Sequence, residues 1–172
     1  MFQTSGTSYL FAVNALVESA YLIKNGTAVS LSEQHIWNCA AGSINAVLAY
    51  LIGGVPSSAT VPLQTTKKTC NPTLPRPFKI LSYTNGGNSS CANIISALQT
   101  APVVVFVETT DWMTYQSGIV STSCNGSSLR IYALLVGLSS DAWTLKGSFG
   151  TTDWGEAGFI RLALGNTCCI CT

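Results

Sequence analysis

The chain has 172 residues, of which only 8 are Lys or Arg and 7 are Asp or Glu, so 9% are charged against about 25% in an ordinary soluble domain. Hydrophobic residues make up 47% and the net charge is +1, a balance that supports a buried core and argues against disorder. So few basic side chains argue against nucleic-acid binding, and the longest apolar runs are too short to span a membrane. The 20 Ser and 19 Thr residues predict a weakly charged, hydroxyl-rich surface that associates with copies of itself.

The first part of the chain predicts helices. Apolar residues recur at helical spacing over 8–24, and Asn25-Gly26 follows as a stop signal. Shorter helices are expected over 32–39 and 43–51. Residues 55–77 are rich in Thr, Pro and Ser and predict a long loop.

The second part of the chain predicts mainly strands. One helix is expected over 92–99, among strands over 78–83, 103–108, 118–121, 131–136, 142–146 and 159–162. Helices first and strands second indicate an α+β fold with a helical lobe at 1–77 and a β-rich lobe at 78–172, joined in one compact unit.

Seven cysteines indicate an oxidising, extracellular or secretory compartment, at positions 39, 70, 91, 124, 168, 169 and 171. The number is odd, so at least one thiol is left over or bridges to another chain. The run Cys168-Cys169-Ile170-Cys171 could in principle hold a metal. The sequence has no second Cys-x-x-Cys pair to complete such a site, however, and it has one His. Disulfides are the better interpretation, and no metal or other cofactor is expected.

Three triplets match the acceptor pattern for N-glycosylation. They begin at Asn25, Asn88 and Asn125. A chain rich in Ser and Thr forms such triplets by chance, so the sequence alone does not choose among them.

Several motifs spread along the chain resemble the papain-like cysteine proteases, in their cathepsin L branch. They are the Ser5–Val13 segment, the Leu-Ser-Glu-Gln run that leads to Cys39, the Tyr115-Gln-Ser-Gly-Ile-Val segment, the 128–137 strand and the Trp143–Phe159 run with its Trp-Gly-Glu loop. The resemblance implies a papain-like fold with a helical lobe and a β-barrel-like lobe, here shortened.

Within that family the run Gly6-Thr7-Ser8-Tyr9 is similar to silicateins, sponge proteins associated with silica spicules, which carry Ser where proteases carry the nucleophilic Cys. In the family a His activates the nucleophile and an Asn orients the His. The resemblance places Ile131 at the His position and Gly147 at the Asn position, with Phe149 for the Trp that shields the Asn. Because a Ser hydroxyl needs a base to become a nucleophile, we expect no catalytic residues and a helix-capping role for Ser8.

Two further residues bear on this degenerate site. Gln3 resembles the Gln of the family's oxyanion hole, but it lies one residue too close to Ser8. The single His, His35, falls on the Leu-Ser-Glu-Gln helix, away from the nucleophile in the family.

The resemblance also implies disulfide pairs. Two family bridges are retained, Cys39–Cys70 and Cys124–Cys168. The family offers no partner for Cys91, Cys169 or Cys171, so an extra bridge from Cys91 to the C-terminal cluster or a cross-link between chains is left open.

The interpretation that follows is a silicatein-like structural protein that is not an enzyme. Its partners would be other copies of itself and silica, in an ordered filament or lattice embedded in the mineral of a spicule. Two alternatives remain: a hydrolase or silica-condensing enzyme that uses Ser8 with a non-standard partner, and a degenerate protease that serves as a binding module.

Overall fold

The computed structural model describes residues 6–40, 42–86, 90–110, 112–126 and 129–172. The chain divides into two compact units. Unit 1 comprises Tyr9–Asn85, and unit 2 comprises Gly86–Thr172 together with the N-terminal segment that ends at Ser8. The sequence places the boundary after residue 77; the structure divides the chain after Asn85.

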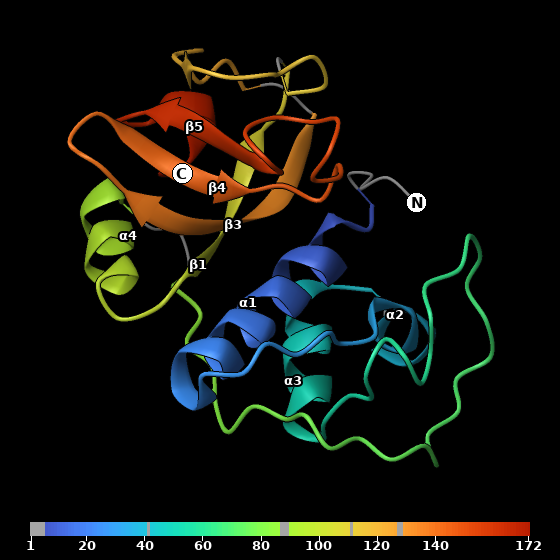
Figure 1. The fold of residues 1–172 in the computed structure, drawn as a ribbon. Coiled ribbons are helices and arrows are strands. Elements are labelled where there is room, and N and C mark those ends of the chain that lie inside the picture. Colours follow the sequence, from blue (N-terminus) through green and yellow to red (C-terminus); the bar gives the residue numbers. More distant parts are fainter. Residues whose placement is uncertain (1–5, 41, 87–89, 111, 127–128) are drawn as a thin grey trace. The chain divides into compact units, whose positions relative to one another are not determined.

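The described residues of unit 1 form three helices, coloured blue to teal in Figure 1: α1 (Ser8–Asn25), whose first residue, Ser8, is grouped with unit 2, α2 (Glu33–Ala40) and α3 (Ile44–Ile52). Side-chain caps set the first residues of two of them. The Ser32 hydroxyl accepts a hydrogen bond from His35 N at 2.9 Å, and the Ser43 hydroxyl accepts one from Ala46 N at 3.2 Å. Such a cap is worth about 1 kcal/mol.

The long segment after α3 is irregular, and α2 holds part of it in place. The buried Gln34 side chain donates to Thr66 O at 3.0 Å and accepts from Gln64 N at 2.7 Å. The Asn38 carboxamide accepts from Lys68 N at 2.7 Å. The Leu-Ser-Glu-Gln motif therefore ends in a side chain that replaces missing backbone partners of the loop.

Unit 2 is built on a five-stranded sheet in the order β1-β3-β4-β5-β2. Its strands are β1 (Val103–Glu108), β2 (Ile119–Val120), β3 (Arg130–Leu138), β4 (Ala142–Lys146) and β5 (Phe159–Ala163). All pairs are antiparallel except β2 with β5. One core cluster fills this unit, with fully buried members that include Val107, Leu135, Leu145, Ile160 and Leu162.

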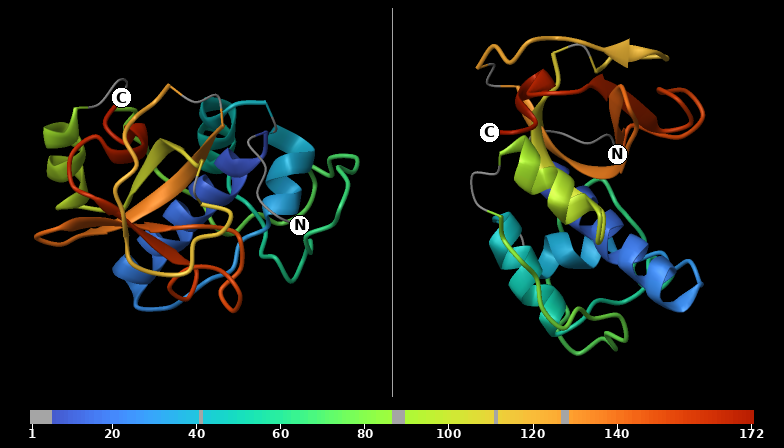
Figure 2. Two further views of the ribbon diagram at one scale, coloured as in Figure 1. Left: turned by 90° about the horizontal axis from the view of Figure 1, so that it is seen from above. Right: turned by 90° about the vertical axis from the view of Figure 1, so that its left-hand side faces the viewer.

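The remaining elements of unit 2 are the helix α4 (Cys91–Leu98) and the 3₁₀-helix η1 (Thr167–Cys169). The Ser90 hydroxyl caps α4 by accepting from Asn93 N at 3.3 Å. The C-terminal segment that carries η1 returns beside α4 (Figure 2), where Cys171 forms a disulfide with Cys91.

The strand expected over 78–83 is wrong, whereas the other expected strands form. Phe78 makes a single bridge with Val55, and Ile80 N donates to Leu51 O at 3.2 Å. The segment thus pairs with the end of α3 and the loop after it, and it belongs to unit 1 instead of a sheet. Among the described residues, no helix has the length and apolar character needed to cross a bilayer.

Candidate functional site

Ser8 is the first residue of α1, and its hydroxyl is tied to the sheet of unit 2. It is fully buried, and its Oγ accepts a hydrogen bond from Tyr132 N at 3.0 Å. Tyr132 follows Ile131 in β3, so Ser8 Oγ bonds to the residue next to Ile131, which the resemblance implies stands at the family's His position. This bond to a backbone N–H orients the hydroxyl but cannot remove its proton.

Ile131 is part of the core of unit 2. Its side chain is 3% exposed, and its backbone is in register with Val107 of β1. An apolar side chain here supplies packing but neither accepts nor donates a proton.

Gly147 leaves room that an aromatic ring has filled. A Cβ at this position would lie 2.5 Å from Cζ3 and 2.8 Å from Cη2 of Trp154, and 3.2 Å from Cδ2 of Phe149. A carboxamide side chain therefore does not fit at position 147 unless Trp154 moves.

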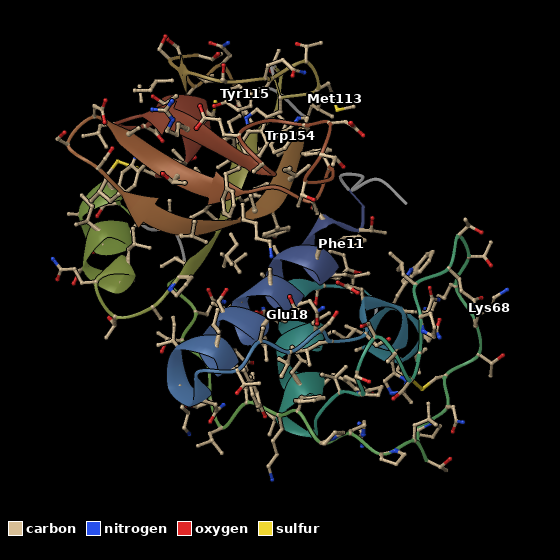
Figure 3. The ribbon with its side chains drawn as sticks, in the orientation of Figure 1. Phe11, Glu18, Lys68, Met113, Tyr115 and Trp154 are labelled. Atoms are coloured by element: carbon tan, nitrogen blue, oxygen red, sulfur yellow. A yellow bond between two sulfur atoms is a disulfide. The ribbon has the colours of Figure 1, made fainter. Side chains whose placement is uncertain are left out.

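Trp154 lies at the centre of an aromatic group in unit 2 (Figure 3), with ring centroids 4.8 Å from Phe149 and 5.9 Å from Tyr115. Its indole N–H donates to Trp112 O at 2.6 Å. Trp112 is fully buried, and its own indole nitrogen has no hydrogen-bond partner among the described residues.

Glu156 joins two motifs of the sequence, the Tyr115-Gln-Ser-Gly segment and the Trp-Gly-Glu loop. Its carboxylate accepts from Gly118 N at 2.9 Å and from the Tyr115 hydroxyl at 3.2 Å. Arg161 of β5 donates to both carboxylate oxygens at 2.8 Å. The Arg161 side chain, then the Gly118 N–H, lower the Glu156 pKa from 4.5 to about 2.

His35 has its hydrogen-bond partners within unit 1. It is 1% exposed, its Nε2 lies 2.8 Å from the Tyr50 hydroxyl, and Cys39 Sγ lies 3.8 Å away. Burial, and then the charge of Arg76, lower the His35 pKa below 6.5. The chain's single imidazole is thus packed inside unit 1, where burial disfavours its charged form.

The structure contains three disulfides, each within one unit. Cys39 pairs with Cys70, as the resemblance implies, and Cys91 pairs with Cys171. Cys124 pairs with Cys169, where the resemblance implies Cys168. Residues 168 and 169 are neighbours that both adopt a positive φ, 52° and 57°, and this tight turn presents the second cysteine to Cys124 while Cys168 is a buried thiol.

One cluster of possible metal ligands and the predicted site residue Gln3 were also candidates for the site. The ligand atoms of Glu108, Cys124 and Cys169 lie within 4.8 Å of one another, but the disulfide between the two cysteines removes the thiolates a metal would need. Gln3 lies outside the described residues.

Chemically, the described residues of unit 2 offer an oriented hydroxyl and include no imidazole. A Ser hydroxyl attacks an acyl carbon only when a group accepts its proton. In unit 2 that acceptor would have to be something other than His, since the chain has a single His and its ring is bonded within unit 1.

The family model for "Papain family cysteine protease" matches residues 2–172. The chain belongs to the papain family. The match covers both units, and the expected α+β, papain-like fold with cathepsin L-like relatives is confirmed.

Named papain-family proteases are similar to nearly the whole chain. Ananain from Ananas comosus is 32% identical over 173 residues, covering 92% of this chain and 50% of the relative. Putative cathepsin L 3 from Paramecium tetraurelia is 32% identical over 171 residues, covering 94% and 54%. The chain therefore spans about half the length of the curated relatives it matches.

A solved structure agrees with these relatives. The Carica candamarcensis cysteine protease CMS1MS2 in complex with E-64 superimposes with a TM-score of 0.87 at 25% identity, covering 98% of this chain and 86% of that one.

These relatives correct one expectation. From Ile131 and Gly147 in the sequence, we expect a chain that is not an enzyme. That expectation is wrong at the level of the family, since the relatives are named cysteine proteases and one is seen with the compound E-64. The two replacements do not by themselves make this chain a pseudoenzyme.

Three features of the site are not predicted from the sequence. They are the hydrogen bond from Tyr132 N to Ser8, the position of the Trp154 ring against Gly147, and the pairing of Cys124 with Cys169. The first involves a backbone N–H, which no residue type announces. The Gly at position 147, where the resemblance implies Asn, is the sequence feature that indicates the close Trp154 ring, because a residue without a side chain permits close approach of a neighbour.

Proposed function

We propose that this papain-family chain self-associates and scaffolds silica. The observation that carries the proposal is the distribution of its few charges. Unit 1 has five Lys or Arg residues and two Glu, whereas the residues of unit 2 include three Lys or Arg and five Asp or Glu. Silica is anionic at neutral pH, so unit 1 is the half of the chain that would contact it.

The cations of unit 1 are accessible. Lys24, Lys67, Lys68 and Lys79 are exposed, and Lys68 projects from the long loop (Figure 3). The loop is fixed by Asn38 and by the Cys39–Cys70 disulfide, so less ordering entropy opposes mineral contact. Abundant Ser and Thr hydroxyls add hydrogen bonds to silanol groups.

Self-association is supported by what the surface lacks. Among the described residues, the ion pairs Arg130–Glu108 and Arg161–Glu156 use four of the chain's 15 charged side chains, so little repulsion between copies remains. Large apolar side chains are exposed in both units, with Leu81 81% and Met113 68% accessible. Exposed apolar groups of this size favour contacts between proteins.

Adsorption to colloidal silica tests the mineral part of the proposal. The Lys68→Glu variant should bind silica several-fold more weakly at low salt, because it places a carboxylate on the basic loop. The matched variant Lys146→Glu makes the same change on β4 of unit 2 and should bind nearly as the wild type does. Equal binding by both variants would contradict a mineral contact through unit 1.

A second candidate function is hydrolysis of an acyl substrate by Ser8, and one observation favours it. Ser8 begins α1 and its hydroxyl is oriented by Tyr132 N at 3.0 Å, and the Gly6-Thr7-Ser8-Tyr9 motif resembles the family segment that carries the nucleophile. In this function Ser8 Oγ bonds to the acyl carbon, the bond to the leaving group breaks, and the proton passes to an acceptor other than His. Water then hydrolyses the acyl-enzyme, which releases the acid and restores the Ser8 hydroxyl.

Turnover of peptide and ester substrates tests this second candidate, with Ser8→Ala as the variant. Activity in the wild type that falls at least 100-fold in Ser8→Ala supports a nucleophilic hydroxyl. The control variant Thr7→Ala, which changes the preceding hydroxyl, should keep the activity. Turnover equal in the wild type and in Ser8→Ala would rule out hydrolysis at Ser8.

A further inference from the structure

The three acceptor triplets for N-glycosylation differ in their structural settings. Asn88 lies outside the described residues, as does Ser127, the third residue of the triplet at Asn125. The Asn125 N–H donates to the buried Glu108 carboxylate at 3.1 Å, directly after Cys124, which is part of a disulfide. Only the triplet at Asn25 lies wholly within the described chain.

Asn25 is the last residue of α1, at a turn that faces solvent. Gly26 adopts a left-handed φ of 67°, and its N–H donates to Leu22 O at 2.9 Å, which ends the helix. Residues 25–28 are all exposed. A Cβ built on Gly26 would meet no described atom within 4 Å, which agrees with the exposure of this turn to solvent.

The neighbouring surface gives such a group something to cover. Leu22 and Ile23, in the last turn of α1, are 49% and 67% exposed. The apolar faces of sugar rings pack on side chains of this kind, which removes apolar area from water.

The chemistry of the chain also fits the compartment where glycans are attached. Its three disulfides, two in unit 2 and one in unit 1, form in the oxidising lumen of the secretory pathway. N-linked glycans are transferred in that same lumen, and they require an accessible Asn-X-Ser or Asn-X-Thr pattern.

We propose that Asn25 carries an N-linked glycan that covers Leu22 and Ile23. In the transfer, Asn25 Nδ2 bonds to the anomeric carbon of an oligosaccharide held on a lipid pyrophosphate. The bond from that carbon to the phosphate oxygen breaks, the lipid pyrophosphate leaves with the electron pair, and Nδ2 loses a proton. This inference does not depend on the proposed contact with silica, which involves other residues of unit 1.

Secretion of the full chain from a eukaryotic host, followed by site-resolved mass spectrometry, tests the inference. Cleavage after Lys24 releases a peptide that extends to Lys67 and contains no acceptor triplet except that of Asn25. The expected result is an intact glycopeptide at this position. The intact glycan must be the readout, because an Asn-Gly sequence deamidates spontaneously and imitates the mass change left by enzymatic removal of the glycan.

Two variants of one residue form the matched control. Thr27→Ser keeps the acceptor pattern and should retain the glycan, whereas Thr27→Ala removes the pattern and should yield the bare peptide. Asn25→Gln provides a second loss variant should either Thr27 variant fold poorly. A secreted wild-type chain with its disulfides formed and Asn25 unmodified overturns the proposal, and so does a glycan found only on Asn88 or Asn125.

Discussion

Gly147 shows how a single residue fixes the character of the candidate site. The ring of Trp154 occupies the volume that a side chain at 147 would need, with Cζ3 only 2.5 Å from the Cβ position. Trp154 is in turn anchored by its hydrogen bond to Trp112 O. Position 147 is therefore coupled to the aromatic packing of unit 2.

We predict that Gly147→Ala destabilises the protein by about 1–3 kcal/mol, because its methyl group displaces an anchored Trp ring. The free energy of unfolding, measured by chemical denaturation, is the readout. Gly6→Ala is the matched control, since a Cβ at Gly6 meets no atom within 4 Å, and it should change stability by less than about 0.5 kcal/mol. An equal effect of both variants would contradict the arrangement of Trp154.

Among the elements, side-chain hydrogen bonds connect irregular segments to helices and strands where regular backbone hydrogen bonds are lacking. Glu156 ties the turn at Gly118 to β5 through Arg161. Gln34 and Asn38 tie the loop after α3 to α2. Each of these residues belongs to a motif that the sequence displays, and the structure supplies the bonds that explain it.

The Glu156 contacts predict a defined acid sensitivity. The Glu156 pKa is lowered from 4.5 to about 2 in the folded protein, so the carboxylate contributes stability above pH 4.5 that is lost as the pH falls from 4.5 towards 2. The Glu156→Gln variant should lose about 1–2 kcal/mol of stability at neutral pH, since its side chain is partly exposed. It should also show a shallower fall in stability over that acidic range.

Thermal unfolding followed from pH 7 to pH 2 measures this effect. Asp153→Asn is the control, because it removes an exposed carboxylate from the same loop. If Glu156→Gln and the wild type lose stability in parallel below pH 4.5, the assigned role of Glu156 is wrong.

The elements with a strong periodic pattern could be predicted from the sequence. The long helix α1 and the strands β1, β3 and β4 form where the apolar pattern places them. The 78–83 segment has the composition of a strand, but its backbone partners come from α3 and Val55. Propensity is overridden wherever pairing is decided by distant residues.

The candidate site was predictable in its residue types and not in its contacts. The motifs locate Ser8, Ile131 and Gly147, yet they do not show that Tyr132 N binds Ser8. The choice of Cys169 over Cys168 depends on one tight turn, and pairing between adjacent cysteines cannot be read from their spacing.

At the scale of the whole molecule, the low charge of the chain is its most unusual property. A papain-family fold is retained with 15 charged side chains in 172 residues, and the ion pairs of unit 2 neutralise four of them. The cations that remain lie mainly in unit 1, and exposed apolar side chains occur in both units. The proposed assembly on an anionic mineral would account for all three features together.

Sedimentation velocity of the purified chain at neutral pH, over a hundred-fold range of concentration, tests the central claim most directly. If the chain self-associates as proposed, its sedimentation coefficient rises with concentration, and electron micrographs of the same samples show ordered filaments. The Leu81→Glu and Met113→Glu variants should associate more weakly, since each places a charge on an exposed apolar position. A single monomeric species at every concentration, with no ordered assembly, would contradict the proposed self-association.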